Sequence, residues 1–267
     1  MPNLRLTLEY EGTRYRGWQE QKNARTVAGE LRQAIEAVVG EPVELGGAGR
    51  TDAGVHALEQ AAHLRLAGRI DPHRFVAAVN DRLPPDIHLL GARPAPKGFH
   101  ARHGALSRSY LYQISRRRTA LAKRFVWWVK RPLDAAVMAA VVPTLVGRHD
   151  FAAFCEKPAE QSSTLVEVER CELASAGDLV LVRLVASHFL WKMVRRVVGT
   201  LVEVGAGALD GRDLAALLEP GHRGAHRPAE WTAPPSGLFL ERVIYAGDPP
   251  LAELAPAVPV GPPGGRR

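Results

Sequence analysis

Cysteine is scarce in this chain of 267 residues, which contains only Cys155 and Cys171. Neither belongs to a pair at the spacing of a metal site, so the sequence excludes both a disulfide framework and a structural zinc. Isolated thiols are typical of proteins from a reducing compartment, and we expect a cytoplasmic protein.

Long apolar runs are also lacking. None approaches the roughly 18 residues that a membrane-spanning helix requires. The N-terminus, MPNLRLTLEYEG, alternates apolar and polar residues from its start, which predicts a strand rather than a signal peptide. We therefore expect no membrane association.

Acidic residues are absent from residues 87–133, although the whole chain holds 28. The same stretch holds eleven lysines and arginines, more than the net charge of +7 of the chain. Such segregation indicates a polyanion binder, although charge alone does not distinguish RNA from DNA, a membrane or an ordinary arginine-rich surface. If the partner is a nucleic acid, we expect these residues to contact its phosphates: Arg102, Arg108, Arg116, Arg117, Arg118, Lys123 and Arg124.

Three patterns that could indicate a cofactor or a hydrolase do not hold up. His222 and His226 lie among glycines without a third ligand, so we expect no bound metal. Gly-Ala-Gly at 205–207 follows a predicted helix, whereas a dinucleotide-binding loop follows a strand. Ser107 and Ser109 lack a coupled base and acid, so a hydrolytic triad has no support. The sequence predicts no cofactor.

The first hundred residues predict an α+β unit with the order β-α-β-β-α-β, which is the order of a ferredoxin-like fold. Thr26 is a suitable N-cap for the first helix and Gly40 a suitable terminator. Asp71-Pro72 is a typical start of the second. We expect strands at 4–10, 43–45, 60–66 and 87–92, with helices at 27–38 and 71–83.

The remainder predicts a second unit of the same kind, preceded by an additional strand at 108–114. We expect strands at 125–129, 165–173, 178–186 and 238–245, with helices at 134–146 and 188–204 and a short inserted helix at 213–219. Pro143 should kink the end of its helix. Residues 248–267 are rich in proline, glycine and alanine, which predicts a flexible tail. The expected domains are therefore 1–104 and 105–247, followed by this tail.

The most informative segment is GAGRTDAGVHA, residues 47–57. It places Arg50 and Asp52 among glycines and alanines, whose small size permits tight turns and the close approach of a bulky ligand. Taken alone, Thr-Asp-Ala-Gly is also typical of a surface turn with a solvated aspartate. A glycoside hydrolase would need a second carboxylate, and Glu59 is the nearest acid in the sequence.

Two further patterns could serve a nucleic-acid site. Tyr110 and Tyr112 share one face of the basic strand, where an aromatic ring can stack on an extruded base or simply fill the core. Lys192 and Arg195 share a face of an otherwise apolar helix. They are either snorkelling cations or partners of the Asp52 carboxylate.

Residues 47–57 closely resemble the catalytic loop of the tRNA pseudouridine synthase A (TruA) family. The resemblance extends to about Tyr245 through several short motifs: Phe99-His-Ala-Arg102, Arg108-Ser-Tyr110, His149-Asp-Phe151, Met193-Val-Arg195 and Gly237-Leu238. The sequence departs from the family pattern at Gln161-Ser-Ser-Thr164. Relatives often carry an arginine soon after the serine of this segment. Family members vary at Trp191-Lys192.

The resemblance implies the pseudouridine synthase fold, with two ferredoxin-like halves, a central mixed or antiparallel sheet and an active-site cleft. Asp52 then corresponds to the catalytic residue, Arg195 to its orienting partner, Tyr110 to the substrate-stacking ring and Leu238 to the floor of the uracil pocket. Arg50 is positioned to fill the space left by the flipped base.

The implied activity is that of an isomerase, the conversion of uridine to pseudouridine at tRNA positions 38, 39 and 40. The resemblance also implies a homodimer that grips the anticodon stem-loop and needs no cofactor. A non-catalytic RNA-binding protein is the alternative, although it would leave the Asp52 loop without a purpose.

Overall fold

The computed structural model describes residues 3–66, 68, 70–156, 163–222 and 224–261. It divides the chain into two compact units. Unit 1 runs to Leu106 and includes Phe239–Asp248, whereas unit 2 comprises Ser107–Leu238 and the chain from Pro249. No helix in these described residues is long and apolar enough to cross a membrane.

Unit 1 contains the predicted β-α-β-β-α-β order. Its elements are β1 (Asn3–Tyr10), α1 (Val27–Val39), β2 (Glu44–Gly47), β3 (His56–Arg65), α2 (Pro72–Asn80) and β4 (Ile87–Ala95), with a 3-10 turn η1 (Gly12–Arg14) after β1. Both helix starts are confirmed, since Thr26 accepts a hydrogen bond from the Gly29 N–H and Asp71 accepts from the N–H groups of His73 and Arg74.

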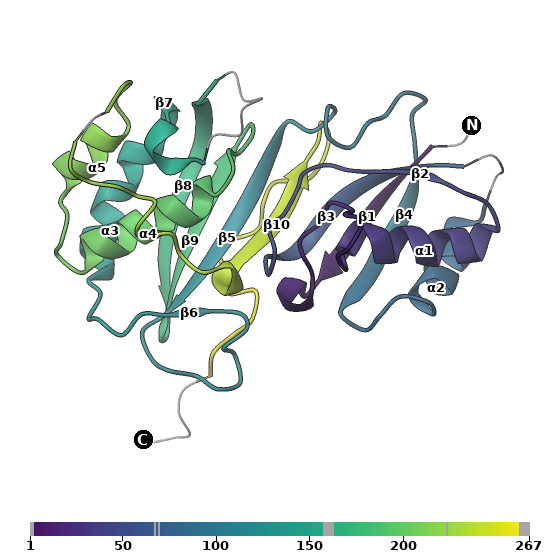
Figure 1. The fold of residues 1–267 in the computed structure, drawn as a ribbon, viewed down its shortest axis with the longest axis horizontal. Coiled ribbons are helices and arrows are strands. Elements are labelled where there is room, and N and C mark those ends of the chain that lie inside the picture. The colour runs from purple at the N-terminus through teal and green to yellow at the C-terminus, as the bar shows by residue number, and fades with distance from the viewer. Residues whose placement is uncertain (1–2, 67, 69, 157–162, 223, 262–267) are drawn as a thin grey trace. The chain divides into compact units, whose positions relative to one another are not determined.

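The sheet of unit 1 is mixed. β1 is antiparallel to both β3 and β4, and β2 is antiparallel to β3. A strand from the far end of the chain, β10 (Leu238–Ile244), runs parallel to β3, with Phe239 beside His56. Because side chains alternate along β1, Leu4, Leu6 and Leu8 are buried in the core. Figure 1 shows α1 and α2 next to each other beside these strands.

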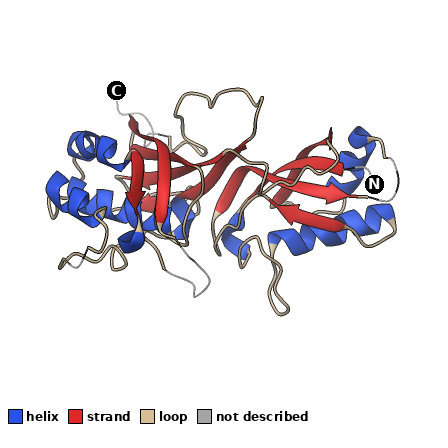
Figure 2. Ribbon diagram, turned by 90° about the horizontal axis from the view of Figure 1, so that it is seen from above, coloured by secondary structure: helices blue, strands red, loops and turns tan. Residues whose placement is uncertain are grey.

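Unit 2 also has a mixed sheet. β5 (Ser107–Ser115), β9 (Leu179–Ala186), β8 (Leu165–Ala176) and β7 (Gly147–Asp150) follow one another as antiparallel neighbours. The short β6 (Trp127–Trp128) pairs parallel with β5. The helices are α3 (Ala135–Val141), α4 (Met193–Gly205) and α5 (Gly211–Leu217), and the 3-10 turns are η2 (Val142–Leu145), η3 (Ala152–Phe154) and η4 (Pro235–Gly237). Figure 2 shows helices beside strands in both units.

Three predicted elements of unit 2 differ in extent. The helix expected at 134–146 changes to a 3-10 turn at Val142, one residue before Pro143, whose ring cannot follow a regular helical turn. The helix expected at 188–204 begins only at Met193, because Lys192 has a left-handed φ of 63°. The strand expected at 125–129 is reduced to β6.

The organisation of the chain also differs from the expected domains. Phe239–Asp248 cluster with unit 1 instead of the second half, because β10 pairs with β3. Residues 249–261 form no helix or strand, but they are not a free tail. The Val258 N–H donates to Gln113 Oε1 at 3.2 Å, and Arg183 donates to the Ala252 carbonyl at 3.0 Å.

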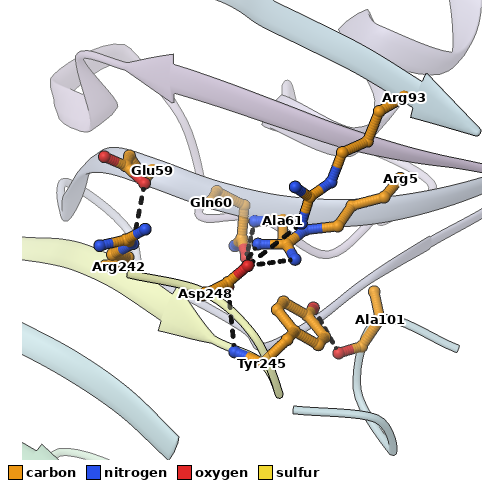
Figure 3. A network of polar contacts seen from close by, with 9 residues as sticks. All are labelled: Arg5, Glu59, Gln60, Ala61, Arg93, Ala101, Arg242, Tyr245 and Asp248. Carbon is orange, nitrogen blue, oxygen red and sulfur yellow. Dashed lines mark hydrogen bonds and ion pairs between the residues drawn. The ribbon is translucent and has the colours of Figure 1, made fainter. Parts of the chain in front are cut away.

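The end of β10 is fastened within unit 1 by the network drawn in Figure 3. Asp248 accepts hydrogen bonds from Arg5 at 3.0 and 2.8 Å and from Arg93 at 3.1 Å. The Tyr245 hydroxyl donates to the Ala101 carbonyl at 2.7 Å. Arg5 also lies 4.0 Å above the centre of the Tyr245 ring.

Candidate active site

Asp52 lies in the loop that joins β2 to β3 in unit 1. Its side chain is half-buried, and the adjacent Arg50 is exposed. The loop turns at Asp52, whose carbonyl accepts from the Val55 N–H at 3.1 Å. Behind it, the buried hydroxyls of Thr51 and Tyr10 are 2.8 Å apart. Burial raises the pKa of Tyr10 to about 12, even further above physiological pH than the usual value of 10.0.

The segment after β1 holds the loop from the other side. The Trp18 N–H donates to the Thr51 carbonyl at 3.1 Å, and the Gly54 N–H donates to the Tyr15 carbonyl at 3.3 Å. These two hydrogen bonds flank Asp52, since they involve the residue before it and the second residue after it. The position of its backbone is therefore fixed by a second part of the chain.

Glycine is required where this segment touches the loop. A Cβ atom on Gly12 would lie 1.9 Å from the Val55 carbonyl oxygen. At Gly17 it would lie 2.4 Å from the Thr51 carbonyl oxygen, and the φ of +91° is itself unfavourable for other residues. Sequence reasoning missed this role of residues 12–18. The available signal was the repeated pairing of glycine with an aromatic residue, in Gly12–Tyr15 and Gly17–Trp18.

The start of β3 provides a third support. His56 is buried and accepts a hydrogen bond from the Gly12 N–H at 3.1 Å. Its ring stacks on Phe239 of β10 with 4.9 Å between the ring centres. Gln60, also buried, donates to the Gly49 carbonyl at 3.2 Å. The Asp52 loop thus rests on the sheet of unit 1, which favours a well-positioned carboxylate over a mobile surface turn.

Glu59 does not resemble the second acid of a glycoside hydrolase. It forms an ion pair of 3.2 Å with Arg242 of β10, and Figure 3 shows the two side chains facing each other. The Glu59 carboxylate is therefore already engaged by a cation of the neighbouring strand. Among the described residues, no group of three or more His, Cys, Asp or Glu is arranged to hold a metal ion.

In unit 2, the structure distinguishes the two tyrosines of β5. Tyr112 is fully buried, and its hydroxyl donates to the Pro234 carbonyl at 2.7 Å. Tyr110 is half-buried and meets Phe189 edge to face, with 4.9 Å between ring centres. Only Tyr110 therefore retains surface on which a base could stack.

Arg195 is half-buried in the first turn of α4. Its Nε donates to the Ala233 carbonyl at 2.6 Å, which fixes the side chain at its guanidinium end. Lys192 does not share this face of a helix, contrary to expectation. It precedes α4 and joins Arg196 in contacting Glu156, at 2.5 and 3.3 Å respectively.

Leu238 is buried and begins β10 directly after η4. The candidate residues are thus divided between the units: Asp52 and Arg50 belong to unit 1, and Tyr110, Arg195 and Leu238 to unit 2. The Gln161-Ser-Ser-Thr164 departure begins outside the described residues.

Residues 87–133 contain no acid, but acidic residues from other parts of the chain pair with three of their arginines. Arg93 pairs with Asp248, Arg117 with Asp178 at 2.6 Å, and Arg131 with Glu203 at 2.5 Å. The stretch also crosses the boundary between units, with Arg102 in unit 1 and the other six predicted RNA contacts in unit 2.

Those seven side chains differ in their availability. Arg108 donates to the Ser187 carbonyl at 2.8 Å, and Arg116 donates to the Gly177 carbonyl at 2.6 Å. Arg118 lies over the Trp128 ring, 5.7 Å from its centre. Arg102, Arg116, Arg118, Lys123 and Arg124 are exposed, whereas Arg108 and Arg117 are half-buried.

Comparisons with known proteins agree with the motifs. A family model described as tRNA pseudouridine synthase matches residues 7–103 and 141–246. Relatives named tRNA pseudouridine synthase A include a protein of Allorhizobium ampelinum, 40% identical, with 93% of this chain and 96% of the relative covered. That of Nitrobacter winogradskyi is 41% identical, with 95% and 99% covered, and that of Caldicellulosiruptor bescii is 37% identical, with 92% and 100% covered. The chain therefore belongs to the tRNA pseudouridine synthase A family, whose members are isomerases.

Proposed function

We propose that this protein converts uridine to pseudouridine at positions 38, 39 and 40 of tRNA, with Asp52 as the catalytic carboxylate. One observation carries the proposal: a half-buried aspartate is held in a loop whose backbone is fixed on both sides, by Trp18–Thr51 and Gly54–Tyr15 hydrogen bonds. A backbone held in this way keeps the Cβ atom of Asp52, and with it the carboxylate, in a defined region.

The reaction exchanges one bond for another. The bond between N1 of uracil and C1′ of ribose breaks, the base rotates, and a bond forms between C5 and C1′. C5 loses its proton and N1 gains one, so no net oxidation, hydrolysis or phosphoryl transfer occurs and no cofactor is needed. Asp52 acts either as a nucleophile at the sugar or as a base at C2′.

The target base must leave its stack before Asp52 can reach the sugar, which costs a few kcal/mol. In the proposal, Arg50 fills the vacated space, and its exposure beside Asp52 supports this role. Tyr110 stacks on the extruded uracil, and its half-buried ring supports that role. Arg195 orients the Asp52 carboxylate through a planar fork, and Leu238 forms the floor of the uracil pocket.

The substrate is gripped at its anticodon stem-loop by a homodimer in the cytoplasm. RNA helices are recognised mainly through backbone and shape, so arginines and lysines on the surface are the expected contacts. The exposed Arg102, Arg116, Arg118, Lys123 and Arg124 support this part of the proposal more strongly than Arg117, which is paired with Asp178.

The decisive experiment is incubation of unmodified tRNA with the purified protein in the absence of metal ions. Pseudouridine-specific chemical mapping should then report modification at positions 38, 39 and 40. Binding of tRNA without any pseudouridine formation would overturn the proposal and favour a non-catalytic RNA-binding protein.

A further inference from the structure

A cavity of about 470 Å³ opens beside the Asp52 loop within unit 1. It is lined by residues 13–16, 23–25 and 53–54. Its volume is in the range of sites that bind a ligand. Ala53 and Gly54 in its wall directly follow Asp52 in the sequence, so a molecule that occupies it lies next to the catalytic loop.

The cavity is strongly basic. Three arginines line it, and none of its lining residues is acidic. Arg25 is engaged, because it pairs with Glu30 at 2.6 Å and lies 4.8 Å above the centre of the Tyr15 ring. In the described part of the chain, no carboxylate pairs with Arg14 or Arg16, and both are exposed. These two guanidinium groups are therefore available to an anion.

The residue between these two arginines is anchored in the core. Tyr15 is extended, with φ −113° and ψ 146°, and its side chain is buried. Its hydroxyl donates to Asp86. Arg14 and Arg16, in contrast to Tyr15, are exposed, and both line the cavity.

Backbone hydrogen bonds connect the walls of the cavity to the Asp52 loop. The Tyr15 carbonyl accepts from the Gly54 N–H at 3.3 Å, and the Arg16 N–H donates to the Arg25 carbonyl at 2.9 Å. Both walls of the cavity are thus tied by backbone hydrogen bonds to each other and to the residues that follow Asp52. A group bound by Arg14 and Arg16 is held at a fixed position relative to the catalytic carboxylate.

From these observations we propose that the cavity is a phosphodiester-binding subsite, in which Arg14 and Arg16 hold the RNA backbone beside the target uridine. The proposal rests on the proposed function, since it assumes an RNA substrate at Asp52. A guanidinium group binds phosphate through paired N–H donors, which gives both attraction and orientation. This contact would hold the RNA strand in position while the target uracil is flipped out of its stack.

The first test is the salt dependence of tRNA binding by the variant R14A/R16A. Each phosphate contact contributes about 0.7 to 0.9 to the slope of log affinity against log salt, so loss of both should shallow the slope by about 1.5. The matched control is R74A/R82A, which removes the same charge from exposed positions of unit 1 on and after α2. Its slope should remain that of the wild type. Equal slopes for all three proteins would overturn the subsite.

The second test locates the contact. A set of anticodon stem-loop RNAs, each with one uncharged methylphosphonate linkage, is titrated with wild type and with R14A/R16A. We expect about tenfold weaker wild-type binding when the replaced linkage lies beside the target uridine. For R14A/R16A, the same replacement should weaken binding little relative to the unmodified RNA. Such non-additivity indicates that the arginines contact the replaced phosphate. Equal losses in both proteins at every linkage would overturn the proposal.

The two proposals fail in different ways. If the wild type forms no pseudouridine in tRNA, the proposed function is lost, whatever the binding data show. If the wild type is active and R14A/R16A retains its slope and its response to every linkage, only the subsite is lost. Thermal unfolding of each variant checks that the exposed substitutions leave the fold intact.

Discussion

The carboxylate of Asp248 accepts two hydrogen bonds from the guanidinium group of Arg5, at 3.0 and 2.8 Å. Only 6% of the Asp248 side chain and 11% of the Arg5 side chain are exposed, so water screens the pair weakly. Burial alone would raise the pKa of Asp248. The hydrogen bonds from Arg5, the Tyr245 N–H and Arg93 outweigh that effect and lower the pKa to about 2.

This shift predicts acid-sensitive stability. The folded-state pKa lies below the unfolded value of about 3.9, so the stabilisation is complete above pH 4 and lost as the pH falls towards 2. Asp248→Asn should lower the free energy of unfolding at pH 7 by on the order of 2 kcal/mol, measured in urea, and by much less near pH 2.5. Asp178→Asn is the control, since its pair with Arg117 is more exposed and should matter little. A pH-independent effect of Asp248→Asn would contradict the assignment.

A second prediction concerns Asp52. Asp52→Asn should abolish pseudouridine formation and leave folding and tRNA affinity nearly unchanged, because the amide keeps the shape but not the reactive carboxylate. Single-turnover assays and filter binding measure the two effects separately. Glu59→Gln, at a carboxylate that already pairs with Arg242, should remain active. Turnover of Asp52→Asn within tenfold of the wild type would remove Asp52 from the mechanism.

A third prediction concerns Arg195. Arg195→Lys keeps the charge but loses the planar fork and the Nε–H that donates to Ala233. We expect kcat to fall more than tRNA affinity, because the proposed role of this guanidinium group is to orient the Asp52 carboxylate. A kcat equal to that of the wild type would show that Arg195 has only a structural role.

A fourth prediction concerns Arg116, Arg117 and Arg118. Changing all three to alanine should shallow the salt slope of tRNA binding by about one to two, and not by three. The structure supplies the reason, since Arg117 already pairs with Asp178. R116A/R118A should therefore reproduce most of the change. Binding should weaken similarly for cognate and non-cognate tRNA, because backbone contacts carry no sequence information. An unchanged slope in the triple variant would indicate a surface that does not meet RNA.

Features that depend on residues close together in the sequence could be predicted, whereas those that depend on distant residues could not. The starts of α1 and α2 were predictable because their capping residues act on backbone groups two or three positions away. Lys192 could not be predicted as a left-handed residue, since the local pattern continues an apolar helix and Glu156, which contacts its side chain, is far away in the sequence.

The electrostatic environment of the basic segment also depends on residues that are distant in the sequence. Residues 87–133 contain no acid, yet Asp248, Asp178 and Glu203 each pair with one of their arginines from a distant part of the chain. The loop at Asp52 was recognisable from its own eleven residues. The segment that supports it at Gly12 and Gly17 has a weaker signal, because the need for its glycines arises from the distant carbonyl groups of Val55 and Thr51.

The pairing of β10 with β3 has a consequence for protein synthesis. Residues 239–248 leave the ribosome last among the parts of unit 1, after nearly all of unit 2 has been made. Until β10 is synthesised, the nascent N-terminal unit lacks the strand that pairs with the start of β3. His56 also lacks the Phe239 ring on which it stacks. An unpaired strand edge of this kind exposes a growing chain to aggregation, so the Asp52 loop acquires its full support only after β10 has been made.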